Sequence, residues 1–568
     1  MMINFSKRVF SLLESMSLMC WKFPRYRYIL FAIATFVSIL FLGYHFGTFD
    51  QSIHIPFLKK FADPSLYPND RFLDLRFTHF SYFWFLFIPF YKLGFLEISM
   101  FITYVGIIYL TFYAIWKLTK TLFDNPVVSF LSVVAFMFPH MGFSLLVLIE
   151  FSLLNRTFVL PFLLLAIDSY LNKRYFRAYG MLGFFSNFHV LSVNFVLAMF
   201  LFDSVIRLRS IGWKKLFLSL GLFVFFALPV LIWKSKVSPL DLSIRREWFS
   251  IIDRGLLHHL FIGFTTNPKF ILLSLGGFGT LIMFFIGWYY SRKTQIDSVI
   301  ARFTIAGIFI LIVNFIVAQW LPVTIIVESQ IVRVSAFILL FGYLYFIYFL
   351  VKYYSENKTM THRFLLLIFT TIISGSPIIP PFIWYIQKRF QSRQLLRFLT
   401  CVAFLSSVFF LFLAAKLGLW YPGIYVFAKK DADYDVQMWA RMNTPKDAVF
   451  ITPPTPWLFY DLEWRVISER STVTHLGELA EAVFSPDYIS YWRPRFESLA
   501  PHSLEKFRGD VFENKEMVKQ AFYRLSTEEL KKIAQQYGAS YLVVEKPHLY
   551  NLPEVYGNTT YRVYLLTK

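Results

Sequence analysis

The sequence predicts a polytopic, mostly helical membrane protein that ends in a small α/β domain. Of its 568 residues, 57% are hydrophobic, 21% are aromatic and only 16% are charged, which is too apolar for a single soluble core. Apolar runs long enough to cross a bilayer alternate with short basic loops. From about residue 431 the composition becomes that of a soluble domain of ordinary size.

The charge and the cysteines exclude several classes of function. The net charge of +21 comes from Lys and Arg in short loops, where the positive-inside rule for membrane proteins accounts for it. We therefore expect no nucleic-acid partner. Cys20 and Cys401 are the only cysteines, so neither a disulfide framework nor a cysteine-based metal site is available.

Residues 1–27 are expected to form a cytoplasmic segment, because basic residues from Lys7 to Arg27 precede the first apolar run. The segment lacks a short apolar core followed by a cleavage site, which favours an uncleaved signal anchor. The first span then runs from Tyr28 to Phe46.

The segment 47–79 is predicted to be a catalytic loop outside the cytoplasm. Asp50 stands just beyond the first span and opens a polar stretch, Gln51 to Asp70, that is rich in residue types used in catalysis. Asp63, Asp70 and Asp74 lie in ordinary turn contexts. Phe80 to Leu93 carries many aromatic residues and is expected to lie at the membrane surface as a helix kinked at Pro89.

The rest of the transmembrane domain, which we place at residues 28–420, is expected to bring the total to about 11–13 spans. Further spans are expected at about 98–116, 127–146, 153–171, 176–189, 190–206, 216–233, 270–290, 302–321 and 331–351. Basic loops such as Lys173 to Arg177 all fall on the cytoplasmic side, which supports this topology.

Residues 364–386 allow two topologies. Gly375 to Pro377 and Pro380-Pro381 break the apolar run, and basic residues follow it, which favours a helical hairpin that returns to the cytoplasm. A final span at 398–415 would then deliver the C-terminal domain to the outside. A single crossing at 364–386 would instead place that domain in the cytoplasm.

The C-terminal domain, residues 431–568, is predicted to have an α/β fold. Ala448 to Ile451 and Tyr541 to Val544 are β-rich runs, and Ser526-x-x-Glu529 is a capping box that begins a helix ending at Gly538. The chain has no GxGxxG after a strand, no Walker A, no HExxH and no GxSxG motif.

These features together resemble the GT-C superfamily of polytopic glycosyltransferases. The likeness rests on an acid after the first span, a polar loop, many spans and a soluble α/β tail. Trp439 to Thr452 is similar to the start of the soluble domain in several members, including oligosaccharyltransferase catalytic subunits. The resemblance implies a sugar donor linked to a polyprenyl phosphate or pyrophosphate.

The sequence departs from two branches of that superfamily. The lipid-A aminoarabinose and protein mannosyltransferase branches usually have Asp-Glu after the first span, whereas this chain has Asp50-Gln51. The WWDYG signature of oligosaccharyltransferases is absent, and Pro453 to Trp457 stands in its place. The branch therefore stays open.

Sugar transfer from a lipid phosphate needs a base for the acceptor hydroxyl and cations for the departing phosphate. Asp50 is the candidate base, and its alternative role is that of a solvated loop acid. His54, one helical turn further on, could orient Asp50 or hold a metal, although a single histidine in an aromatic loop is commonly structural.

Candidate phosphate-binding residues are Arg156, His189 and Arg333, with Glu328 beside Arg333. The alternatives for Arg156 and His189 are that the side chain reaches the membrane surface by snorkelling or has its hydrogen bonds satisfied within the protein. The alternative for Glu328 and Arg333 is a structural ion pair between the two. The segments that carry these residues share one predicted depth, so we expect them to enclose a cavity at the outer membrane face together with Asp50.

We expect an integral, multi-pass protein of a bacterial inner membrane. Its expected function is transfer of a sugar from a polyprenyl-phosphate donor to a lipid, glycan or protein acceptor at the extracytoplasmic face. A transporter or flippase of a lipid-linked or anionic substrate, and a non-catalytic scaffold of the same architecture, are the alternatives. The expected partners are the lipid-linked donor and membrane lipids; no cofactor is certain, and a divalent metal is left open.

Overall fold

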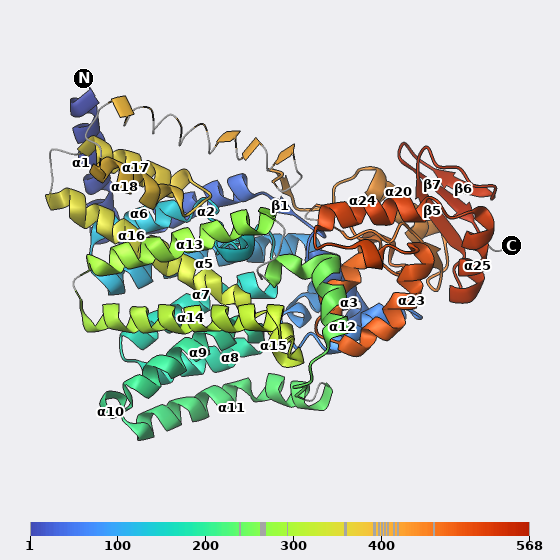
Figure 1. The fold of residues 1–568 in the computed structure, drawn as a ribbon, viewed down its shortest axis with the longest axis horizontal. Helices are drawn as coiled ribbons and strands as arrows, with labels where there is room; N and C mark the ends of the chain where they lie inside the picture. Colours follow the sequence, from blue (N-terminus) through green and yellow to red (C-terminus); the bar gives the residue numbers. More distant parts are fainter. Residues whose placement is uncertain are drawn as a thin grey trace.

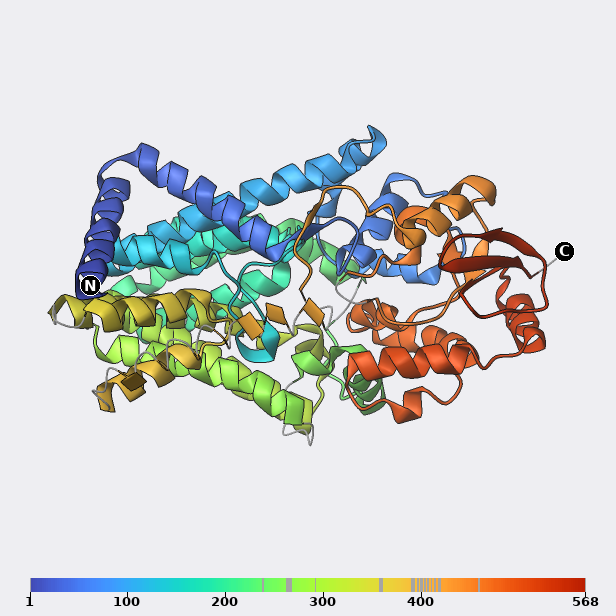
Figure 2. The same cartoon turned by 90° about the horizontal axis from the view of Figure 1, so that it is seen from above.

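The computed structural model describes residues 2–237, 240–261, 268–291, 293–356, 361–389, 420–457 and 460–566, with scattered positions between 390 and 419. A bundle of helices occupies one end of the elongated molecule, and a domain that contains a β-sheet occupies the other (Figure 1). The N-terminus lies at the end of the bundle that is far from this domain in both views (Figures 1 and 2).

Five helical segments of the described chain are long and apolar enough to cross a membrane. They are α2 (Pro24–Leu42), α5 (Leu96–Phe123), α11 (Trp213–Val237), α14 (Gln295–Gln319) and Ile331–Ser355, most of which is α16 (Ser335–Glu356). In the last segment 94% of the most apolar window is buried, whereas α11 is only 17% buried. A helix that is apolar on all sides is stable either inside a bundle or in lipid. The buried α16 is therefore at the centre of the bundle, and the largely exposed α11 is at its edge. The chain is an integral multi-pass membrane protein.

Further helices complete the bundle, and several match the predicted spans. They are α1 (Met2–Lys22), α6 (Pro126–Ala135), α7 (Asn155–Leu171), α8 (Tyr175–Ser186), α9 (Val190–Ile206), α10 (Leu208–Ile211), α13 (Pro268–Tyr289), α17 (Thr361–Ile373) and α18 (Ile379–Arg389). Two helices, α17 and α18, pack against each other where the hairpin was predicted. Most of the span expected at 398–415 lies outside the described residues.

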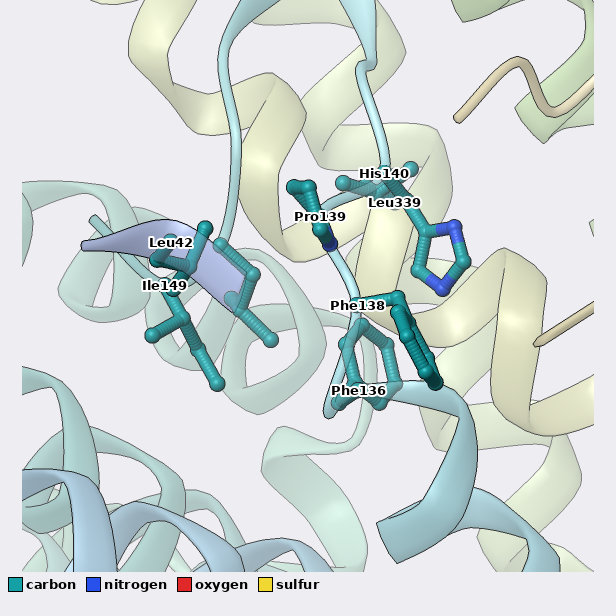
Figure 3. A pocket seen from close by; sticks show the side chains of 8 residues that line it. Leu42, Phe136, Phe138, Pro139, His140, Ile149 and Leu339 are labelled. Atoms are coloured by element: carbon teal, nitrogen blue, oxygen red, sulfur yellow. The ribbon is translucent and has the colours of Figure 1, made fainter. Parts of the chain in front are cut away.

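The span predicted at 127–146 is wrong, because α6 ends at Ala135. Pro139 follows closely, and a proline cannot continue the hydrogen-bond ladder of a helix. The imidazole of the buried His140 lies 2.9 Å from the Ala135 carbonyl oxygen and 2.9 Å from that of Ser374. Pro139 and His140 line a small, mainly apolar pocket with Leu42, Ile149 and Leu339 (Figure 3).

Residues 80–93 also differ from the single surface helix that was predicted. They form a 3-10 turn, Trp84–Phe87, and the short helix α4 (Ile88–Lys92). Pro89 stands in the first turn of α4, where its missing N–H costs nothing, so it begins a helix and does not kink one. Phe83 and Trp84 are buried because they pack into the bundle.

The C-terminal domain contains a mixed five-stranded sheet in the order β4-β3-β5-β7-β6. Its strands are β3 (Val449–Ile451), β4 (Ser471–Thr472), β5 (Tyr541–Glu545), β6 (Glu554–Gly557) and β7 (Tyr561–Leu565). Its helices are α20 (Ala432–Asn443), α21 (Trp464–Ser468), α22 (Leu479–Ala482), α23 (Ile489–Leu499), α24 (Val511–Phe522) and α25 (Thr527–Tyr537). The strands β3, β4 and β5 are parallel, and β7 runs antiparallel to its neighbours. The predicted α/β fold, both predicted strands and the capping box of α25 are confirmed.

Short elements join the two ends of the molecule. The strand β1 (Tyr44–His45), directly after α2, pairs in parallel with β2 (Ile424–Tyr425), which leads into the C-terminal domain. Gly43 has a φ of 81°, and a Cβ atom there would lie 2.9 Å from the Tyr421 carbonyl oxygen, so only glycine fits this close approach. The helices α3 (Gln51–Ala62), α12 (Arg246–Ile252) and α15 (Thr324–Glu328) fill the junction. The exit of the first span and the C-terminal domain therefore share one side of the bundle.

Candidate functional site

Much of the segment predicted as a polar loop is the helix α3, and every residue from Gln51 to Lys59 is buried. Asp50 stands at its N-terminus, where the backbone carbonyl of Asp50 accepts hydrogen bonds from the Ile53 and His54 amides. Gln51 Oε1 accepts from the Gly47 amide at 2.9 Å, and Gln51 Nε2 donates to the Leu153 carbonyl at 3.0 Å. An acid at this position would lose the second bond, so the glutamine has a structural role here.

An ion-pair network surrounds Asp50. Arg156 Nη1 lies 2.7 Å from Asp50 Oδ2, and Arg156 Nε lies 2.6 Å from Glu150 Oε1. The side chains of Arg156 and Glu150 are 15% and 17% exposed, whereas that of Asp50 is 26% exposed. Asp50 is thus the member of the network that a substrate can reach most easily.

Arg333 and two histidines extend this network. Arg333 lies within electrostatic range of Asp50 and Arg156. Its Nε donates to Gln330 Oε1 at 2.7 Å, which fixes the direction of the guanidinium. His189 caps α9 and lies within range of both arginines, and His259 is close to Arg333 and Asp50. The predicted residues Asp50, Arg156, His189 and Arg333 therefore gather in one region.

Glu328, predicted to belong to this site, does not join them, and the alternative of a structural Glu328–Arg333 pair is wrong as well. No ion pair joins these two side chains in the described part of the chain. Glu328 lies at the end of α15, where the nearest charges belong to Lys234, Asp241 and Arg245. Burial raises the pKa of the Glu328 carboxyl to about 7. The short α15 and the following turn direct Glu328 and Arg333 to different surroundings.

His54 lies beside a second group of polar side chains. Its ring centroid is 4.2 Å from that of His79 and 4.7 Å from that of Trp84, on which it stacks. His79 Nδ1 in turn lies 3.6 Å from Glu481 Oε2 in α22. Asn155, the neighbour of Arg156, places its Nδ2 atom 3.1 Å from His79 Nε2. Two imidazoles and a carboxylate are side chains that can hold a divalent metal.

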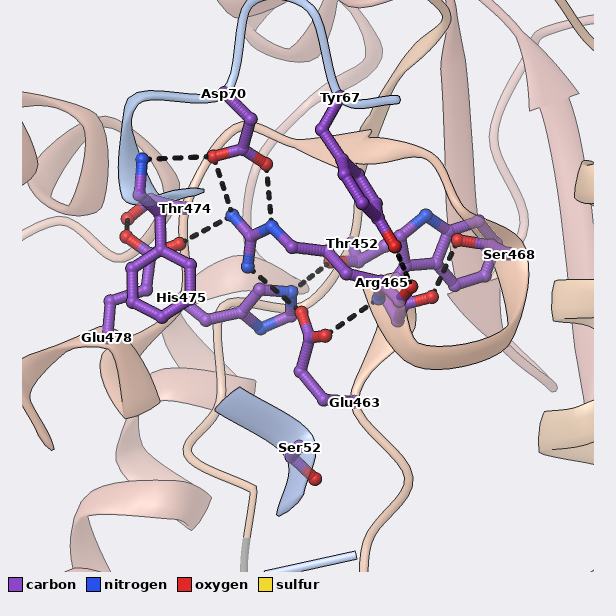
Figure 4. Close-up of polar contacts among 12 residues, drawn as sticks. Ser52, Tyr67, Asp70, Thr452, Glu463, Arg465, Ser468, Thr474, His475 and Glu478 are labelled. Carbon is purple, nitrogen blue, oxygen red and sulfur yellow. Dashed lines mark hydrogen bonds and ion pairs between the residues drawn. The ribbon is translucent and has the colours of Figure 1, made fainter. Parts of the chain in front are cut away.

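A buried cluster of charges fastens the C-terminal domain to the segment after α3 (Figure 4). The Arg465 guanidinium binds three carboxylates: Asp70 at 2.6 Å, Glu463 at 2.9 Å and Glu478 at 2.7 Å. The prediction that Asp70 only shapes a turn is therefore wrong, although it also accepts from the Phe72 amide. Asp63 does form the predicted turn, accepting from the Ser65 amide.

Several residues of this region are not predicted by any local sequence pattern. The sequence places Glu150 with Arg156 at the start of one span, but His79 is recognisable only as a histidine near the end of the 47–79 segment. Glu481 belongs to the C-terminal domain whereas its partner His79 precedes the second span, and Arg465 lies 395 residues from Asp70. No local pattern could have found them.

No family model and no curated protein matches the sequence. Among solved structures, the chain is similar to the oligosaccharyltransferase of Archaeoglobus fulgidus in its apo form. The two are 11% identical with a TM-score of 0.41, and the match covers 91% of this chain and 69% of the other. The fold and the polar cluster define a multi-pass membrane protein whose C-terminal α/β domain covers a charged site at the end of the bundle.

Proposed function

We propose that this protein is a membrane glycosyltransferase that moves a sugar from a polyprenyl-phosphate donor to a lipid, glycan or protein acceptor. This proposal rests on the ion-pair network around Arg156. In it Asp50, the more exposed of the two acids, pairs with Arg156 and lies within electrostatic range of Arg333. A base next to two guanidinium groups is the combination that transfer from a lipid phosphate requires.

Each group has a defined task in the proposed reaction. The Asp50 carboxylate takes the proton of the acceptor hydroxyl as the acceptor oxygen bonds to the anomeric carbon. The bond between that carbon and the phosphate oxygen breaks, and the electron pair leaves with the lipid phosphate. Arg333, whose described side-chain hydrogen bond goes to the neutral Gln330, stabilises the new negative charge, since a guanidinium can bind phosphate through two N–H groups.

The proposed site faces the extracytoplasmic side. The elements β1 and α3, which flank Asp50, and the C-terminal domain lie at one end of the bundle, whereas the N-terminus and α10, which is flanked by basic residues, lie at the other (Figure 1). Basic loops are retained in the cytoplasm. We also propose that the membrane is the inner membrane of a bacterium.

The position of the charges supports an enzyme over a transporter. A secondary transporter places its ionisable groups near the midplane on broken helices. Here the Asp50 network lies at the junction with the C-terminal domain. Asp203, a buried acid of a bundle helix, is already paired with Arg207 and Arg302 near the end of α9. The two hydrogen bonds of Gln51 give this residue a structural role, and the proposed chemistry rests on Asp50 and the two arginines.

Mass spectrometry of lipid-linked sugars and surface glycans tests this proposal. Cells that lack the protein should accumulate one polyprenyl-phosphate sugar and lose that sugar from one class of glycan. Expression of the wild-type chain should reverse both changes. Identical profiles with and without the protein, under conditions in which it is made, would contradict the proposal.

A further inference from the structure

Three ionisable side chains from distant parts of the chain meet beside the Asp50 site. His54 belongs to α3, His79 follows the 3-10 turn Arg71–Phe77, and Glu481 belongs to α22 of the C-terminal domain. One potential ligand atom from each lies within 4.8 Å of the other two. None of the three takes part in the Asp50–Arg156–Glu150 network, so this is a separate cluster.

We propose that His54, His79 and Glu481 bind a divalent transition-metal ion of the zinc class, with at least one coordination position open to a further ligand. Two imidazoles and one carboxylate form a common ligand set for such ions, and they leave a fourth position for water or substrate. The ion would join the C-terminal domain to the segment that carries Asp50.

Two buried polar atoms in the cluster have no hydrogen-bond partner among the residues that the structure describes. They are His54 Nδ1 and Glu481 Oε2, and each of the two residues is only 3% exposed. A buried carboxylate oxygen without a partner is costly, because it has lost its water and gained nothing in return. A cation between the two atoms would satisfy both.

The spacing also favours an ion over a direct contact. The 3.6 Å from His79 Nδ1 to Glu481 Oε2 is too long for a good hydrogen bond. Two ligands that each lie about 2.1 Å from a tetrahedral ion are separated by about 3.4 Å. The observed separation is therefore close to that of two ligands of one ion.

Surrounding residues hold the histidines in place. Asn155 contacts His79 Nε2 and so turns Nδ1 toward Glu481. Metal-binding histidines commonly have such a polar partner on the second ring nitrogen. Trp84 stacks on His54 with an angle of 26° between the rings.

Titration of the chelator-treated, full-length protein in detergent with Co²⁺ alone tests this proposal. Calorimetry should show one tight site per chain, and the visible absorption should be that of a four- or five-coordinate Co²⁺ ion. His54→Ala and Glu481→Gln should each weaken binding by about 100-fold or more. His502→Asn, which changes an exposed histidine of the same domain, should bind like the wild type.

The proposal would be overturned if both cluster variants bound Co²⁺ as tightly as the wild type. It would also be overturned if His502→Asn weakened Co²⁺ binding as much as the cluster variants do. Thermal unfolding of the metal-free proteins controls for folding. His54→Ala and stripped wild type should share one midpoint, and Co²⁺ should raise only that of the wild type. If His54→Ala does not fold, Glu481→Gln provides the same comparison.

The proposed metal site and the proposed sugar transfer can fail independently. Asp50→Asn should bind Co²⁺ as the wild type does, because Asp50 is not a ligand. Tight binding in a protein without transfer activity would remove only the proposed function. Transfer by a protein without a metal site would remove only this inference.

Discussion

Arg156 is the side chain around which the candidate site is organised. It holds Asp50 through Nη1 and Glu150 through Nε, so each carboxylate has a fixed position relative to the other. Charge-assisted hydrogen bonds of this kind are stronger and more directional than neutral ones. The arrangement holds one oxygen of the partly exposed Asp50 carboxylate against Arg156 and keeps the group in place for an incoming hydroxyl.

The first prediction concerns Asp50 as the base. Asp50→Asn keeps the size of the side chain but removes its basicity, so transfer should fall by about 100-fold or more. The measurement is sugar transfer from a polyprenyl-phosphate donor in membranes with matched protein levels. Asp63→Asn, which changes an acid of a turn after α3, is the control and should stay active. Unchanged transfer by Asp50→Asn would remove Asp50 from the mechanism.

The second prediction separates Arg333 from Asp50. Because Arg333 is proposed to hold the donor phosphate, Arg333→Ala should raise the KM for the donor as well as lower kcat. Lysine should restore activity only in part, since a point charge replaces a planar group with two parallel donors. Full activity with lysine would show that charge alone suffices, and full activity with alanine would exclude the role. Arg245→Ala, at an exposed ion pair with Asp487, is the matched control.

At the scale of single elements, the connection between α3 and α21 determines how the C-terminal domain sits. Lys59 Nζ donates to Glu469 Oε1 at 2.8 Å, and Tyr67 Oη donates to the Arg465 carbonyl at 2.7 Å. Beside them, one guanidinium serves the three acids Asp70, Glu463 and Glu478. Because the cluster is buried and has more acids than bases, it favours the retention of a proton.

The third prediction is a pH dependence that originates in this cluster. Burial raises the pKa of Glu463 from 4.5 to about 7, although Arg465 opposes the shift. The native state therefore binds a proton at Glu463 that the unfolded chain has lost, so the contribution of Glu463 to stability should fall as the pH rises from about 4.5 to about 7 and then level off. The slope should reach at most about 1.4 kcal/mol per pH unit.

Thermal unfolding midpoints of the purified chain across this range provide the measurement. Glu463→Gln should flatten the dependence, because an amide cannot ionise. Glu528→Gln, which changes an exposed acid of the same domain, should leave the profile unchanged. Burial also lowers the pKa of the neighbouring His475 to about 3, and this group contributes a pH dependence of opposite sign, so the test is the difference between the wild-type and Glu463→Gln midpoints. A difference that does not change between about pH 4.5 and pH 7 would contradict the assignment of a proton to Glu463.

At the scale of the whole molecule, the bundle separates two ends of different character. The end near α10 and the N-terminus carries basic segments, and the opposite end carries the Asp50 network and the C-terminal domain (Figures 1 and 2). Because basic segments are retained on the cytoplasmic side, this separation gives the chain one preferred orientation in the membrane.

The fourth prediction is the membrane topology. In a cysteine-free background, an impermeant thiol reagent should label Asn69→Cys and Gln535→Cys in intact cells, because both positions are exposed at the Asp50 end. Lys214→Cys, exposed at the opposite end, should react only after the cells are opened. If only Lys214→Cys were labelled in intact cells, the orientation of the protein would be the opposite of the predicted one.

The sequence alone determined the class of the protein and the location of most helices. The apolar run of α9 is a local signal, because the thickness of the bilayer sets the length of such a run. The capping box of α25 is also local, because it depends on hydrogen bonds between residues three positions apart. The end of α6 at Ala135 and the burial of α3 were not predicted. Pro139 limits α6 and is a local signal, whereas the burial of α3 depends on distant segments, since a polar helix can be buried wherever such partners satisfy it.

Only the tertiary structure decided which charged residues meet. Asp50, Arg156 and Arg333 were recognisable as charges near the ends of spans, but their grouping depends on how α3, α7 and α16 pack. Glu328, only five positions from Arg333, lies among other charges. Interactions between ions depend on distance in space, and a sequence gives distance along the chain, so the partners Glu481 and Arg465 became visible only in the folded molecule.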